Sequence, residues 1–124
     1  MTQAQLSVTV LPRYLEEHSQ PAQNEYAWSY TVTIVNTGTV SAQVVGRHWV
    51  ITDATGLVEE VRGLALVGHQ PLIPPGEKFE YTSWTRLASP RGQMRGTFFC
   101  MTEEARPFDT PVPAFELSQA HALH

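Results

Sequence analysis

Apolar and polar residues alternate with a period of two along much of the chain. In the clearest case, over residues 26–35, serine and threonine separate Trp28, Tyr30, Val32 and Ile34. Because successive side chains of a strand point to opposite faces, this spacing gathers the large apolar groups on one face. The pattern predicts a half-buried β-strand whose apolar face contributes to the core.

Similar runs recur at short intervals and are separated by turn residues. The turns at 36–39 and 53–56 each contain a glycine, a residue that suits tight turns. We expect the second and third strands to pair as a hairpin across the first of these turns. Pro111 and Pro113 place the last strand at a sheet edge. The expected strands cover residues 6–10 (ending at Pro12), 26–35, 43–52, 58–61, 78–85, 94–101 and 108–117.

Prolines break the segment 63–76, so no helix runs through it. Pro71, Pro74 and Pro75 lack an amide hydrogen, and each restricts the residue before it. Short β-prone runs between such breakers are typical of an all-β sandwich or barrel. We predict a single domain over 1–124, with seven or eight strands in two packed antiparallel sheets and a loose tail over 118–124. The expected core is Trp28 or Tyr30 with Val32, Ile34, Trp49, Ile51, Phe79, Tyr81, Phe98 and Phe115.

The composition narrows the class of function. Eight Lys and Arg against twelve Asp and Glu give a formal net charge of −4, which disfavours binding to the phosphate backbone of nucleic acids. No apolar run approaches the roughly 18 residues of a membrane span, and no basic stretch precedes an apolar one at the N-terminus. The single cysteine, Cys100, makes no internal disulfide. These features predict a cytoplasmic protein without a membrane or nucleic-acid partner.

Gly63 and Gly68 stand in a spacing close to the G-x-G-x-x-G motif of dinucleotide-binding proteins. That motif needs a helix directly after it, whose first amides hold the pyrophosphate. Here prolines follow His69, and Ala65 occupies the middle position, where a β-carbon obstructs the approach of a phosphate. Glycines that satisfy the backbone geometry of a loop are the simpler interpretation.

Reactive side chains are present but form no recognisable catalytic group. Cys100 lies in an apolar run, which predicts a buried, inert thiol. His48 has no second histidine at metal-ligand spacing, and we expect Trp49 beside it to be a core residue. The adjacent acids at 59–60 and 103–104 would point to opposite faces of a strand. We therefore expect no catalytic residues, no metal site and no cofactor.

Several stretches in one order and spacing resemble the bacterial ApaG proteins over nearly the whole chain. They are RHWVITD at 47–53, VEEVRG at 58–63, VGHQP at 67–71, PGEKFEYTS at 75–83, MRGTF at 94–98 and FEL at 115–117. Where the family usually has Gly-x-Gly-x-x-Gly, this chain has Ala65 in the middle. Trp84 stands where the family more often has a small residue.

The resemblance implies a small β-sandwich of the immunoglobulin or fibronectin type III kind, in agreement with the strand pattern. It also implies a genetic link to cobalt resistance and magnesium efflux, without an assigned molecular activity. In eukaryotic proteins the domain serves as a partner-binding module. We therefore expect a non-enzymatic protein-interaction module that supports divalent-cation homeostasis through a protein partner.

An alternative is a small-ligand binder. It would take pyrophosphate or a nucleotide weakly at the glycine segment between Gly63 and Gly68, with Arg47, Arg62 and His69 as anion contacts. Hydrolysis of dinucleotide polyphosphates is disfavoured, because metal-assisted phosphate chemistry needs a cluster of carboxylates or histidines. A homodimer formed through exposed strand edges stays open.

The segment 63–76 is the longest expected loop, and loops carry binding residues more often than strands do. Its apolar residues outnumber its polar ones, so either they close one end of the sandwich or some stay exposed as a partner patch. Arg62 and His69 flank the loop, where we expect them to orient a carboxylate or phosphate group of the partner. The apolar residues are Leu64, Leu66, Val67, Leu72 and Ile73.

Overall fold

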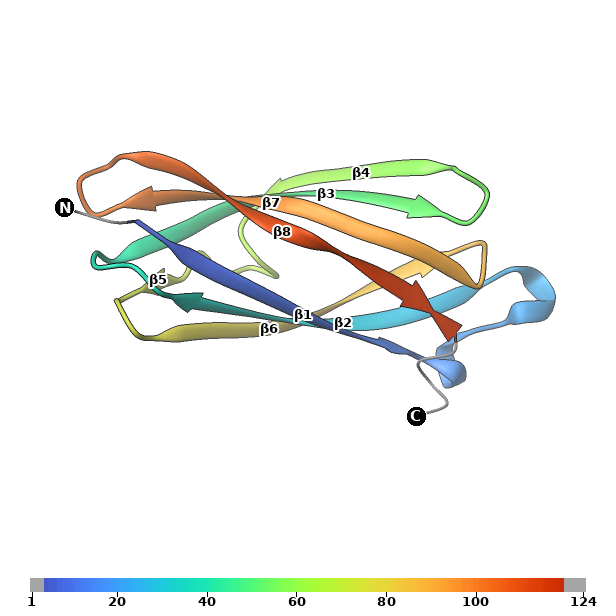
Figure 1. The fold of residues 1–124 in the computed structure, drawn as a ribbon. Coiled ribbons are helices and arrows are strands. Elements are labelled where there is room, and N and C mark those ends of the chain that lie inside the picture. The colour runs from blue at the N-terminus through green and yellow to red at the C-terminus, as the bar shows by residue number, and fades with distance from the viewer. Residues whose placement is uncertain (1–3, 120–124) are drawn as a thin grey trace.

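The computed structural model describes residues 4–119 and consists of two antiparallel β-sheets packed face to face (Figure 1). This confirms the predicted all-β sandwich. The described residues form eight strands and two short 3₁₀ helices. The elements are β1 (Leu6–Tyr14), η1 (Glu16–His18), η2 (Pro21–Gln23), β2 (Tyr26–Asn36), β3 (Ala42–Asp53), β4 (Val58–Leu64), β5 (Leu72–Ile73), β6 (Lys78–Leu87), β7 (Arg91–Thr102) and β8 (Pro107–Ser118).

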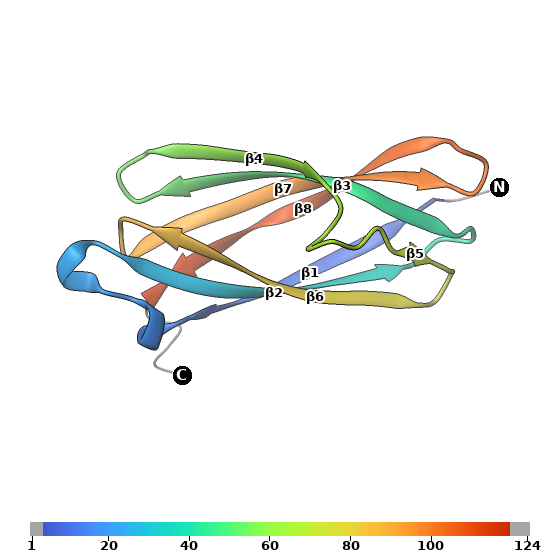
Figure 2. The same ribbon diagram turned by 180° about the vertical axis from the view of Figure 1, so that it is seen from behind.

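The strands divide into a smaller and a larger sheet. The smaller sheet has the order β1-β2-β6, and the larger has the order β4-β3-β7-β8, with β5 paired to β3. On one side of the sandwich β1 lies against β8. On the other side the segment between β4 and β5 lies between the edge strands β4 and β6 (Figure 2). This second side positions the candidate site.

The core forms between the alternating faces that the sequence predicts. Trp28, Tyr30, Val32 and Ile34 on β2 are at most 5% exposed. Trp49 and Ile51 face them from β3 in the other sheet and are also buried. Of the remaining predicted core residues, Tyr81 and Phe98 are buried, whereas Phe79 and Phe115 are only partly buried against the cluster.

The first strand continues through Pro12 to Tyr14, so the prediction that it ends at Pro12 is wrong. Pro12 lies opposite Tyr30, and β1 is an edge strand of its sheet. A missing amide hydrogen is tolerated on the open side of an edge strand. Pro111 and Pro113 lie in β8, the edge strand of the larger sheet, as their positions predict.

The predicted hairpin between the second and third strands is also wrong, because β2 and β3 belong to different sheets. The buried Asn36 side chain holds the connection between the layers. Its amide nitrogen donates to the carbonyl oxygens of Val40 (2.9 Å) and Ile73 (2.8 Å), and its Oδ1 accepts from the Gly38 amide (2.8 Å). The bond to Ile73 joins this connection to a residue of β5 that is distant in sequence.

The end of β8 is held by the core. Ser118 is buried, and its carbonyl oxygen accepts a hydrogen bond from Trp28 Nε1 at 3.2 Å. The predicted tail begins at this residue, and its positions 120–124 lie outside the described residues.

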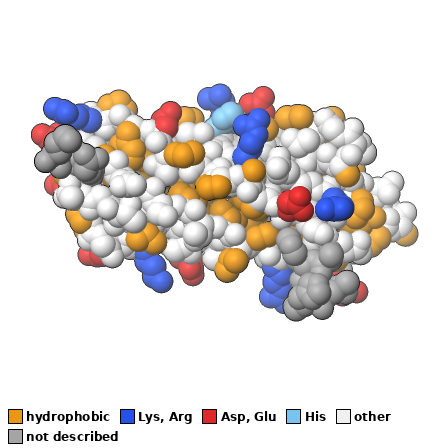
Figure 3. Space-filling view, viewed as in Figure 1, with side chains coloured by type: hydrophobic (Ala, Val, Ile, Leu, Met, Phe, Trp, Pro, Cys, Tyr) orange, Lys and Arg blue, Asp and Glu red, His pale blue; other side chains and the backbone are white. Residues whose placement is uncertain are grey.

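The surface beside β1 and β8 mixes apolar and charged groups. Hydrophobic side chains reach the surface between the strands, with charged side chains around them (Figure 3). Over residues 4–119 the structure contains no helix that is long and apolar enough to span a membrane.

Candidate functional site

The stretch from the end of β4 to β5 carries several exposed apolar side chains. Leu64, Val67 and Leu72 are 78%, 57% and 59% exposed, whereas Leu66 and Ile73 are buried. Leu66 and Ile73 therefore close the sandwich, whereas the other three residues face solvent. We call residues 64–72 the apolar loop.

The tip of the apolar loop is a tight turn. The backbones of Leu66 and His69 exchange two hydrogen bonds, at 2.7 and 3.0 Å, around Val67 and Gly68. Both central residues have a positive φ, 50° and 85°, as in type I′ turns. A positive φ suits glycine, but a β-branched side chain is strained there. The chain thus holds an exposed valine in an unfavourable backbone conformation.

Arg47 fixes the base of the apolar loop from inside the sandwich. Its Nη1 donates to the carbonyl oxygens of Leu64 (3.0 Å) and Ala65 (2.9 Å). The pairing of β3 with β4 places Arg47 opposite Gly63. A β-carbon on Gly63 would lie 2.8 Å from Nη1, so the guanidinium can occupy this position only because residue 63 is glycine. Two of the predicted site residues are therefore in direct contact.

A cleft opens beside Arg47 between β4 and β6. Two adjoining cavities, of about 230 and 390 Å³, make up this Arg47 cleft. Val67 and Tyr81 line the smaller cavity, near the apolar loop. Glu59 and Arg86 line the larger one. The residues that line both cavities are Tyr30, Arg47, Trp49 and Ser83.

Two tyrosines face the cleft from the smaller sheet. Burial raises the pKa of the Tyr30 phenol, although a hydrogen bond with Ser83 and the charge of Arg47 act in the opposite direction. Tyr81 is 9% exposed, and its hydroxyl has no hydrogen-bond partner among the described residues. Burial raises the pKa of Tyr81 well above its ordinary value. Both phenols are therefore protonated at neutral pH, next to a positive charge.

The other predicted anion contacts lie apart from this cleft. Arg62 is opposite His48 in the β3–β4 pairing, on the outer face of the larger sheet. His48 pairs there with Glu60, with 2.7 Å between Nε2 and Oε1. His69 is exposed, and its ring lies 5.8 Å from that of Phe79. Neither Arg62 nor His69 lines the two cavities, so the structure brings together only Arg47 and Gly63.

Two backbone amides between Gly63 and Gly68 already donate hydrogen bonds within the fold. The Ala65 N–H donates to the Val45 carbonyl at 2.8 Å, and the Leu66 N–H donates to the His69 carbonyl at 2.7 Å. Anion-binding loops work by presenting successive free amides. The next element is the short strand β5 rather than a helix. Pyrophosphate or nucleotide binding at this segment stays a prediction.

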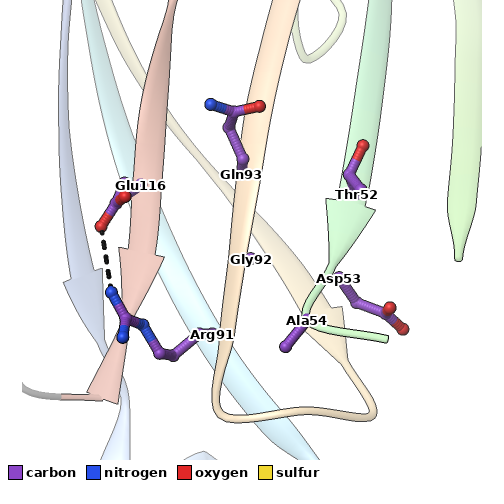
Figure 4. Close-up of a pocket in the computed structure, with 7 residues that line it drawn as sticks. All are labelled: Thr52, Asp53, Ala54, Arg91, Gly92, Gln93 and Glu116. Atoms are coloured by element: carbon purple, nitrogen blue, oxygen red, sulfur yellow. Dashed lines mark ion pairs between the residues drawn. The ribbon is translucent and has the colours of Figure 1, made fainter. Parts of the chain in front are cut away.

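Another cavity, of about 340 Å³, lies where β3 ends and β7 begins (Figure 4). Arg91 extends toward Glu116 of β8, with 3.6 Å between Nη2 and Oε2, and both side chains are exposed. Asp53 turns away, and its carboxylate accepts bonds from the Thr55 amide (2.9 Å), the Thr55 hydroxyl (2.6 Å) and the Leu57 amide (3.0 Å). The Thr55 hydroxyl is the main cause that lowers the pKa of Asp53. Asp53 thus stabilises its own turn. The Arg91–Glu116 ion pair is exposed, and such pairs stabilise a fold only weakly.

Cys100 lies in the core, and the adjacent acids at 59–60 lie on opposite faces of β4. Cys100 is 2% exposed, and burial raises the pKa of its thiol to about 11, as expected of an inert core thiol. Glu60 pairs with His48 on the outer face, while Glu59 lines the cleft, so these adjacent acids do point to opposite faces. Across residues 4–119, no group of three or more His, Cys, Asp or Glu side chains is placed to hold a metal ion.

The sequence pattern did not identify Tyr81 and Ser83 as cleft residues. Alternation along β6 predicts that both face inward, and both do. The pattern does not tell which residues of the other sheet they meet. The contact between Arg47 and Gly63 follows from the β3–β4 register, in which pairing around the connection 53–57 sets these two positions opposite each other.

The chain is closely similar to proteins of one family. The family model described as the ApaG domain matches residues 16–102. Protein ApaG of Ralstonia nicotianae is 54% identical over 124 residues, the full length of both chains. Protein ApaG of Bordetella pertussis is 52% identical over 119 residues, which are 96% of this chain and 91% of that protein. The crystal structure of the putative ApaA protein from Bordetella pertussis matches with a TM-score of 0.92 and 51% identity, over 94% of this chain and 95% of that one. The fold and this identity over the full chain agree: the chain belongs to the ApaG family.

Proposed function

We propose that the protein is a non-enzymatic interaction module that binds a partner protein through the apolar loop. The exposure of Leu64, Val67 and Leu72 carries this proposal. Their backbone is fixed by Arg47 and by the buried Leu66. Apolar groups on a preorganised loop lose little conformational entropy on binding, and exposed apolar patches are typical of interaction sites.

The backbone at Val67 gives independent support. A β-branched residue with a φ of 50° is destabilising by on the order of 1–3 kcal/mol. Its side chain is 57% exposed, so burial regains little of this loss. Strained residues are often kept where a function requires their side chain. Contact with a partner is the role that an exposed valine fits.

In this proposal the chain contributes binding and its partner contributes the chemistry. We assign no catalytic step to Cys100, because its thiol is buried and protonated. Asp53 is likewise used by its own turn. The module then supports divalent-cation homeostasis by binding a protein that handles the cation, in line with the genetic link that the family resemblance implies.

Capture by loop variants tests the proposal. The immobilised protein is incubated with a lysate of the source organism, and the retained proteins are quantified by mass spectrometry. The variant Leu64→Ser with Leu72→Ser removes two exposed apolar contacts and should change the melting temperature by only a few degrees. The matched control is Leu11→Ser with Leu57→Ser, whose leucines are 75% and 68% exposed outside the loop.

We expect the loop variant to retain about tenfold less of the specific partner than the parent does, while the control retains as much as the parent. Replacing Arg62, which lies beside the loop, and His69, which lies within it, with alanine should also weaken capture without changing the circular dichroism spectrum. Equal capture by the parent and by the Leu64/Leu72 variant, with matching spectra, would show that the partner binds elsewhere.

A further inference from the structure

Arg47 has hydrogen-bond donors that the fold does not use. A guanidinium carries five N–H donors, and both bonds to the apolar loop come from Nη1. Among residues 4–119, Nε and Nη2 make no hydrogen bond, and no acidic side chain pairs with Arg47. The Nε–Nη2 edge is one with which arginine binds two oxygens of a carboxylate or phosphate.

Tyr81, whose hydroxyl is a second unused donor, lines the same cavity. Tyr81 is more than nine-tenths buried, and its hydroxyl has no partner in the described part of the chain. It lines the smaller cavity together with Arg47. A buried hydroxyl without a hydrogen bond is unfavourable, and such groups are rare in folded proteins. Two residues from different sheets, each with an unsatisfied donor, therefore line one hollow.

We propose that the Arg47 cleft binds one oxyanion group, a carboxylate or a phosphate, of a small organic molecule. Arg47 supplies two donors to the oxyanion, and Tyr81 supplies a third. The remainder of the molecule lies in the larger cavity beside Tyr30, Trp49 and Ser83. This inference goes beyond the docking of a protein on the apolar loop, because it concerns the interior of the sandwich.

The charges along the cleft favour an anion of low total charge. Arg47 lies between Tyr81 at the loop end and Glu59 and Arg86 in the larger cavity. The charges of Glu59 and Arg86 cancel, so the net positive charge of the cleft is that of Arg47. A single oxyanion therefore fits better than pyrophosphate. The volumes of the two cavities suit a molecule of small-metabolite size.

An NMR titration tests the site. Sodium benzoate and inorganic phosphate are added separately to ¹⁵N-labelled protein, while the Arg47 Nε–H signal and the Tyr81 and Ser83 amide signals are followed. Benzamide is the uncharged control, and pyrophosphate is the competing anion. Saturable changes in the chemical shifts of these three residues with benzoate or phosphate support the proposal. The probe that binds with the higher affinity identifies the oxyanion.

Three results would overturn it. They are no saturation with either probe up to tens of millimolar, equal shifts with benzamide, and strongest binding by pyrophosphate with shifts centred on Gly68 and His69. Each result leaves the capture experiment on the apolar loop unaffected. The Leu64→Ser with Leu72→Ser variant should still bind the better probe, so the two proposals can fail separately.

Tyr81→Phe separates binding from folding. Because the hydroxyl has no hydrogen bond to lose in the free protein, the melting temperature should not fall. The affinity for the better probe should fall by about tenfold. Arg95→Met is the control for loss of positive charge. It should leave the affinity unchanged, because Arg95 is exposed on β7 and lines neither cavity. Unchanged affinity in Tyr81→Phe, or the same loss in Arg95→Met, contradicts the proposal.

Discussion

Trp49→Ala should strongly destabilise the fold, because Trp49 joins the two sheets. Its side chain is 3% exposed, and its ring lies 5.6 Å from that of Tyr30 in the opposite sheet. The ring centroids of Phe98 and Phe115 lie 5.8 and 6.1 Å from that of Trp49. Truncating a buried tryptophan costs about 3–5 kcal/mol, because the cavity that remains does not collapse fully.

This magnitude converts into a shift of the melting temperature. For 124 residues, the entropy of unfolding is about 0.26 kcal/mol/K, so Trp49→Ala should lower the melting temperature by about 12–19 °C. Differential scanning calorimetry measures the shift. Trp84→Ala is the matched control, because Trp84 is 60% exposed and its loss should change the melting temperature by only about 2 °C. Equal shifts in the two variants, or a loss below about 4 °C for Trp49→Ala, would refute the assignment of Trp49 to the core.

Three further predictions concern individual side chains. Because burial raises the pKa of the Cys100 thiol to about 11, the folded protein should react negligibly with a disulfide reagent near pH 8, whereas the protein unfolded in guanidinium chloride should react rapidly. A rapid reaction of the folded protein would contradict the burial of this thiol. Because the folded-state pKa of Asp53 is lowered, the stability it contributes should be lost as the pH falls below 3.8, and Asp53→Asn should show a weaker acid dependence of the unfolding midpoint than the parent. Gly63→Ala should destabilise the fold by about 1–2 kcal/mol, because the new β-carbon displaces Arg47 from the loop carbonyls. In a double-mutant cycle measured by denaturant unfolding, Gly63→Ala, Arg47→Ala and the double variant should lose the same stability. Full additivity of the two single losses would argue against the contact.

The features that the sequence predicted are those encoded by neighbouring residues. Alternation over 26–35 and 78–85 assigns the inward faces of β2 and β6 because the period of a strand is local. The sheet to which β3 belongs involves contacts distant in sequence, such as its pairing with β7 and the bond from the Asn36 amide to the carbonyl of Ile73. No local pattern contains these contacts, so the turn residues after β2 wrongly favoured a hairpin.

In the candidate site, too, the sequence identified the residues with local signals and missed those that depend on contacts between the sheets. Arg47 and Gly63 could be identified because their residue types are informative and their strands pair around one turn. Tyr81 reaches the cleft from the other sheet, so its unpartnered hydroxyl became evident only in three dimensions. The positive φ of Val67 was hidden as well, because valine is among the residues least expected in that conformation.

Val67→Asn, measured for both stability and capture, tests most directly whether the apolar loop exists to bind a partner. Asparagine tolerates a positive φ better than valine, so the melting temperature should rise by about 4 °C for roughly 1 kcal/mol of relieved strain. Capture of the specific partner should fall, because the exposed apolar side chain is lost. A variant that melts at or above the parent temperature and captures the partner equally well would contradict the proposed role of the loop.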